Sequence, residues 1–188
     1  MVKTRRRCQN DTTVTPVSSP MLELDHVWSK MIDEAAFKAS NAGRQDIIDY
    51  LRLRATNDAI RKAGVSWLFE TVIEISSEAS RHRSGISIER VEPHKFARGN
   101  SNMVGSLIEI RQGVRCLSVE AGWARTPSDG IMLNGALAVA RIFHFGMPKY
   151  TAELKLIHGD ELPQWLHDDG SFVDASAIIR HVEIFLSS

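Results

Sequence analysis

Between residues 25 and 80, apolar side chains recur every three or four positions, the spacing of one buried face of an α-helix. Gly43 and Gly64 interrupt this pattern, and glycine is the usual residue just beyond the end of a helix. The pattern therefore predicts three helices, over about 25–42, 44–62 and 66–80.

After Gly85 the period changes to two, as expected for half-buried β-strands. We place a hairpin turn at 112–113, which would set Arg111 opposite Val114. This register collects four aliphatic residues on one face of the hairpin: Ile108, Ile110, Leu117 and Val119. The other strands are predicted at 86–91, 137–145 and 152–156.

The chain closes with apolar residues at helical spacing behind Asp174, a residue type that caps helix N-termini. Helices and strands are segregated along the chain, which predicts an α+β fold. We expect three N-terminal helices packed on an antiparallel sheet of four to five strands, with a closing C-terminal helix. The domain organisation we expect is a disordered basic and polar tail at 1–20 and a single α+β domain at 21–188. Within that domain we expect a helical part at 21–83, the antiparallel sheet at 86–158 and the C-terminal helix at 174–187.

Composition is that of an ordinary globular protein and excludes collagen-like, coiled-coil, disordered and disulfide-scaffold classes. The 188 residues are 43% hydrophobic and 24% charged, with 23 basic and 23 acidic side chains. The net charge of zero conceals a basic segment at 81–125, which contains eight basic and four acidic residues. Such a segment either attracts phosphate groups or is a solvated face balanced by acidic neighbours.

The chain carries no apolar stretch long enough to cross a membrane, and no apolar region follows the basic residues at its start. We therefore predict a cytoplasmic protein without a membrane partner. The seven histidines and two cysteines show no metal-ligand spacing, so the local sequence predicts no metal and no cofactor. A metal site built from histidines distant in sequence stays open.

The first candidate site is the polar, glycine-bearing segment 92–105, which we interpret as a long loop. Lys95 and Arg98 would supply positive charge to an anion there, and Asn100 would supply an amide. The alternative is an ordinary connection whose polar side chains satisfy its own backbone.

The second candidate is the segment 122–130, which holds Trp123, Arg125 and Asp129. A tryptophan beside an arginine can stack on a ring and bind a phosphate or carboxylate. The alternative is a loop in which Arg125 and Asp129 pair and Trp123 covers the core.

Catalytic residues cannot be assigned from the sequence, and whether the protein is an enzyme stays open. The candidates are His94, Glu120 as a general base, and Asp129.

Two functions follow from these segments. The first is a binding module for an anionic partner, either nucleic acid or a phosphate-bearing ligand, that acts through loops 92–105 and 122–130. The second is a small-molecule enzyme or ligand-binding protein with a pocket formed by the same loops. Oligomerisation through the helical part is a further alternative, since the apolar stripes of residues 24–80 would also fit a partner subunit.

Overall fold

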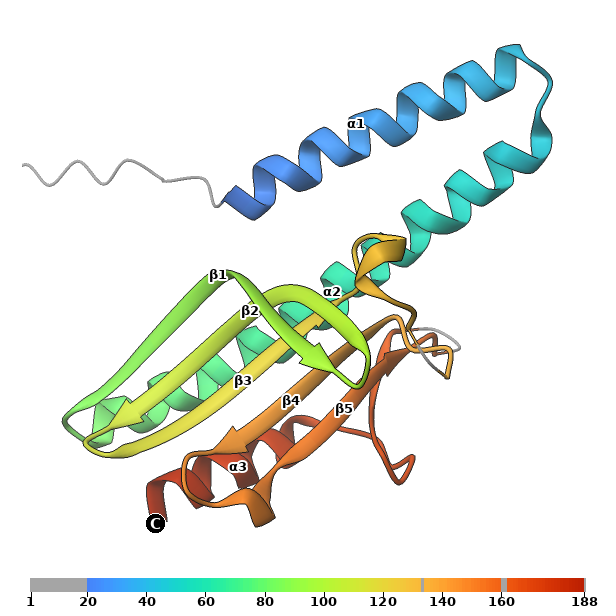
Figure 1. Ribbon diagram of the computed structural model, residues 1–188. Helices are drawn as coiled ribbons and strands as arrows, with labels where there is room; N and C mark the ends of the chain where they lie inside the picture. Colours follow the sequence, from blue (N-terminus) through green and yellow to red (C-terminus); the bar gives the residue numbers. More distant parts are fainter. Residues whose placement is uncertain (1–19, 133, 160–161, 188) are drawn as a thin grey trace, which may run out of the picture.

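A computed structural model describes residues 20–132, 134–159 and 162–187. The predicted tail at 1–20 lies outside these residues, apart from its last position. Two helices precede six strands, and a third helix ends the fold (Figure 1). The helices are α1 (Pro20–Asn41), α2 (Gln45–His82) and α3 (Ala175–Ser187). The strands are β1 (Ile86–Arg98), β2 (Ser101–Gln112), β3 (Arg115–Trp123), β4 (Ala138–His144), β5 (Ala152–Ile157) and β6 (Gln164–His167).

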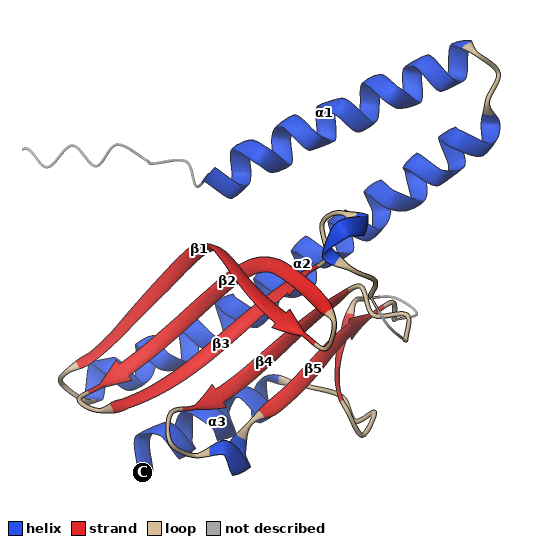
Figure 2. Ribbon diagram, viewed as in Figure 1, coloured by secondary structure: helices blue, strands red, loops and turns tan. Residues whose placement is uncertain are grey.

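The six strands form one antiparallel sheet in which each strand pairs with the next along the chain. The C-terminal part of α2 and all of α3 cover one face of this sheet, while α1 and the first turns of α2 extend beyond it (Figure 2). We call the face under α2 and α3 the inner face and the opposite one the outer face. The prediction of an α+β fold with an antiparallel sheet and a C-terminal helix is confirmed. The predicted strand number was too low, because the short strand β6 was missed.

The core lies between the inner face and the two helices, and it accounts for the periodicity seen in the sequence. Its large side chains that are almost completely buried are Leu68, Phe69 and Val72 of α2, Ile178, Val182 and Phe185 of α3, and Ile108, Ile110, Leu117, Val119, Ile142, Leu154 and Leu156 of the sheet.

The prediction of three N-terminal helices was wrong, because α2 continues through Gly64 without a break. Glycine inside a helix costs about 1 kcal/mol relative to alanine. Here the glycine is needed for packing, since a Cβ at this position would lie 2.6 Å from both methyl groups of Leu156. Gly43 ends α1 as predicted, in the left-handed conformation at φ 66°.

The predicted hairpin has the right faces but the wrong turn. The turn residues are Gly113 and Val114, and Arg111 pairs with Cys116 instead of Val114. Moving the turn by one residue changes each pairing by two positions, so every side chain keeps its face. Ile108 and Ile110 therefore still face the core together with Leu117 and Val119.

Residues 92–105 are not a long loop, which corrects the first candidate site. They are the end of β1 and the start of β2, joined by a turn at Gly99 and Asn100. The pairing of β1 shifts between Val91 and His94, and from there the hairpin bends over the outer face (Figure 1). Gly105 permits this bend, because a Cβ there would lie 1.9 Å from the carbonyl oxygen of Ala121.

A small apolar cluster holds the bent hairpin against the sheet. Met103, Ala136 and Val139 are buried together, with Phe96 and Met132 packed against them.

Asp174 begins α3 as predicted, with its carboxylate accepting a 2.9 Å hydrogen bond from the backbone N–H of Ala177. Within the described ranges, no helix combines the length and the apolar character that crossing a membrane requires.

Candidate functional site

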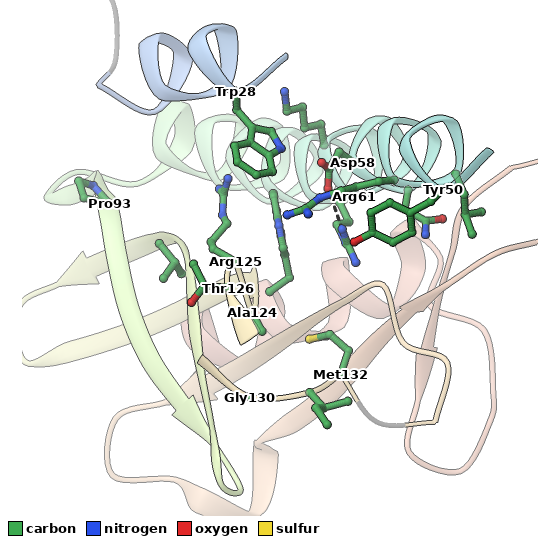
Figure 3. A pocket seen from close by; sticks show the side chains of 17 residues that line it. Trp28, Tyr50, Asp58, Arg61, Pro93, Ala124, Arg125, Thr126, Gly130 and Met132 are labelled. Carbon is green, nitrogen blue, oxygen red and sulfur yellow. Dashed lines mark hydrogen bonds and ion pairs between the residues drawn. The ribbon is translucent and has the colours of Figure 1, made fainter. Parts of the chain in front are cut away.

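A pocket of about 900 Å³ lies between the two N-terminal helices and the segment that follows β3 (Figure 3). The overhang of α1 and α2 beyond the sheet provides one wall, and the strand ends and residues 124–132 provide the other. We call it the helix–strand pocket. Its lining includes Trp28, Tyr50, Leu53, Trp123, Ile131 and Met132 as apolar residues, and Arg54, Asp58, Arg61, Lys62 and Arg125 as charged ones.

Two arginines of the pocket are stacked on tryptophans. The guanidinium carbon of Arg54 lies 4.5 Å from the ring centre of Trp28, and that of Arg125 lies 4.1 Å from Trp123. Each stack is a cation–π contact, which restricts the guanidinium to a defined plane. Trp28 is 39% exposed whereas Trp123 is 5% exposed, so the first stack lies near the solvent-exposed opening of the pocket and the second lies deeper in it.

A third arginine is fixed by hydrogen bonds. Arg61 donates through Nε to the carbonyl oxygen of Leu137 at 2.8 Å and through Nη1 to Asp58 at 2.7 Å. Both side chains of this ion pair are about one-fifth exposed. Asp58 thus neutralises one of the cations and positions it, which leaves the described lining with an excess of positive charge.

The segment after β3 is shaped by Asp129. Its carboxylate accepts hydrogen bonds from the backbone N–H groups of Arg125 and Thr126 and from the Thr126 hydroxyl. These bonds lower the pKa of Asp129, chiefly through the Thr126 hydroxyl, with a smaller contribution from the charge of Lys95. Asp129 therefore contacts the backbone N–H of Arg125, and the guanidinium of Arg125 lies over Trp123.

His94 and Glu120 lie on the outer face, away from the helix–strand pocket. His94 Nε2 lies 2.9 Å from Glu120 Oε2, and Arg141 Nη2 lies 2.7 Å from Glu120 Oε1. The Glu120 side chain is 5% exposed. Arg98 reaches the same face and contacts Glu153 at 3.0 Å and Asp168 at 3.4 Å.

The structure divides the predicted site residues among different places. Trp123 and Arg125 line the helix–strand pocket, whereas Arg98 and Glu120 line a smaller cavity on the outer face. Asn100 is exposed in the turn between β1 and β2.

Sequence reasoning missed the helical half of the pocket. Tyr50, Arg54, Asp58 and Arg61 are spaced by four, four and three residues and so share one face of α2. This mixed aromatic and charged stripe is the sequence feature that could have predicted the helical half of the pocket. Residues 21–80 carry seven basic and ten acidic side chains, and this net negative charge concealed the basic face of α2.

The chain matches no protein-family model, and no curated protein or solved structure is significantly similar to it. Among the described residues, no three or more His, Cys, Asp or Glu side chains are grouped so as to hold a metal ion.

Proposed function

We propose that this chain is a binding protein for a small amphipathic anion, and that the ligand occupies the helix–strand pocket. Such a ligand has an apolar body and one carboxylate, sulfonate or phosphate group. The observation that carries the proposal is the lining itself, in which aromatic and aliphatic side chains surround four basic residues and one carboxylate. A volume of about 900 Å³ is within the range of pockets for small molecules.

The two stacked arginines are the groups that would bind the acid. A guanidinium held against an indole ring is already oriented, so less conformational entropy is lost when it binds a carboxylate or phosphate. Trp28, Tyr50 and Ile131 are partly exposed apolar residues that the ligand body would cover. We propose binding without catalysis, because Asp58, the carboxylate of the lining, is engaged by Arg61.

A small ligand is favoured over nucleic acid by the distribution of the basic segment. Arg81 pairs with Glu78, Arg111 pairs with Glu109, and Arg98 is shared between two carboxylates. Arg90 lies over Phe69 on the inner side of the sheet, whereas Arg98 lies on the outer face. These arginines therefore do not form one continuous basic surface of the kind that follows a phosphate backbone.

The test compares two fluorescent probes with the same aromatic body, 8-anilinonaphthalene-1-sulfonate and the uncharged N-phenyl-1-naphthylamine. We expect the sulfonate to bind at least about tenfold more tightly, because a hydrogen bond to a charged group contributes about 1.5–3 kcal/mol, and about 1.4 kcal/mol corresponds to a factor of ten. Arg54→Gln and Arg125→Gln should each weaken the sulfonate by several-fold and leave the uncharged probe unchanged. Arg52→Gln is the matched control, since Arg52 lies on the same helix, is 74% exposed and does not line the pocket. Equal affinity for both probes, or equal loss with Arg52→Gln, would contradict the proposal.

A further inference from the structure

The helix α1 has a side that faces away from α2. Among residues 26–41, its partly or fully buried side chains are Ile32, Ala36 and Ala39, so this is the side that packs on α2. At about 3.6 residues per turn, the opposite side carries four residues spaced by three, four and three positions: Val27, Lys30, Glu34 and Phe37. We call these four residues the α1 stripe.

The two apolar ends of the α1 stripe are open to solvent. Val27 is 56% exposed and Phe37 is 69% exposed, and the two charged residues between them are exposed as well. No described part of the chain therefore covers the stripe. Burial of both ends against a partner would be favourable, but single exposed apolar residues are ordinary and do not by themselves identify one.

The order of the side chains along the stripe selects a second copy of the same helix. Apolar, basic, acidic and apolar residues follow one another at a spacing that is the same in both directions. If a second α1 runs antiparallel about a two-fold axis level with Ile32, each Val27 lies opposite a Phe37 and each Lys30 lies opposite a Glu34. In a parallel pair, each charge would instead face its own copy, which is unfavourable.

The rest of the fold leaves room for this arrangement. Figure 2 shows α1 along one edge of the molecule, with α2 on its other side, so a second copy approaches the stripe from the free side. The described lining of the helix–strand pocket includes Trp28 of α1 but no residue of the stripe. A partner on the stripe and a ligand in the pocket are therefore independent assignments, and either can fail without the other.

We propose that the α1 stripe is a self-association surface, through which two chains form an antiparallel dimer. Val27 and Phe37 supply the apolar contacts, while Lys30 and Glu34 set the direction and register of the two helices. Exposed ion pairs add little to affinity, but like charges placed opposite each other oppose a wrong pairing. One helix from each chain is a small interface, so the dimer forms and dissociates readily.

The test is sedimentation equilibrium of the full chain over about 10–500 µM, a range suited to a weak interface. We expect the average mass to rise from the 21.0 kDa of one chain toward twice that value. Lys30→Glu and Glu34→Lys should each weaken self-association by about fivefold or more, because two attractive pairs become two repulsive ones. Arg52→Glu is the matched control, since it reverses an exposed charge on α2 and should associate like the parent chain.

Mixing the two α1 variants separates pairing across the stripe from a loss of helix stability. Each variant places like charges four residues apart within its own helix, which weakens α1 by itself whether or not the other variant is present. In the mixture, one chain presents two acids at positions 30 and 34 and the other presents two bases, so the mixed pair should associate at least as tightly as the parent. Circular dichroism checks that each variant remains folded.

Three results would overturn the proposal. The first is a parent chain that keeps the mass of one chain over the whole concentration range. The second is a folded single variant that associates as tightly as the parent, which would place any dimer contact elsewhere. The third is a mixture of the two variants that associates no better than either variant alone.

Discussion

His144 Nε2 lies 3.1 Å from His181 Nδ1, and the stacked rings join the end of β4 to the middle of α3. Burial lowers the pKa of both rings, and that of His181 falls to about 4 because the neighbouring His144, His167 and Arg180 also oppose its protonation. Tyr150 contacts the ring of His144 edge-on from the following turn. The pair is therefore neutral in the folded protein at neutral pH.

The first prediction concerns acid stability. A histidine whose folded pKa lies below its unfolded value takes up its proton mainly on unfolding, so its contribution is complete above about pH 6.5 and falls as pH falls toward 4. We expect the free energy of unfolding in urea to decrease by about 1–2 kcal/mol between pH 7.5 and pH 4.5, after allowance for solvent screening. His181→Leu should flatten this dependence. An unchanged slope in that variant would exclude the pair as its source.

The second prediction tests the glycine inside α2. Gly64→Ala improves helix propensity by about 1 kcal/mol but forces a methyl group against Leu156, which is fully buried. Overpacking of a core costs about 1–3 kcal/mol, so after the gain in helix propensity we expect a net loss of up to about 2 kcal/mol in urea unfolding. Leu156→Val in the same chain should recover part of the loss. A more stable Gly64→Ala protein would show that helix propensity outweighs the contact.

The third prediction concerns the start of α3. Asp174→Ala removes the hydrogen bond to the N–H of Ala177 and should lower the melting temperature by about 2–4 °C. Asp174→Ser retains a capping oxygen and is the control. If serine and alanine lower the melting temperature equally, the cap is not the cause.

The fourth prediction addresses nucleic acid. Arg81, Arg98 and Arg111 are paired with carboxylates, and Arg90 lies on the opposite side of the sheet from Arg98. We therefore expect a chain that starts at Met21 not to bind labelled single-stranded RNA in about 50 mM salt. Fluorescence anisotropy measures this directly. Binding that weakens steeply with salt and is lost on Arg98→Ala would instead restore the polyanion interpretation.

The sequence alone predicts the fold correctly where the local periodicity agrees with the packing of the core. The alternation of apolar and polar residues around Ile108 and Leu117 predicts which side chains of β2 and β3 face the core. Gly43 ends α1 because it adopts the left-handed conformation, which glycine takes more readily than other residues. Gly64 shows the limit of such prediction. This glycine does not end a helix but leaves space for the side chain of Leu156, which is 92 positions away in the sequence.

The candidate site was predicted only in part for a similar reason. Trp123 and Arg125 were found because they are neighbours in sequence, and they do line the helix–strand pocket. Trp28 and Arg54 come from a different segment, and only the turn at Gly43 brings α1 and α2 together. The contact of His94 with Glu120 likewise depends on the bend of β1, which alternation alone does not reveal.

The sparse packing of α1 has a consequence for how the protein responds to a ligand. Among its described side chains, 26–41, the buried one is Ala39, so little of this helix is anchored by the core. Its amide protons should therefore exchange with solvent faster than those of the C-terminal part of α2. A molecule held between Trp28 and Arg125 would slow that exchange along α1, so deuterium uptake in this helix would report occupancy without any knowledge of the ligand.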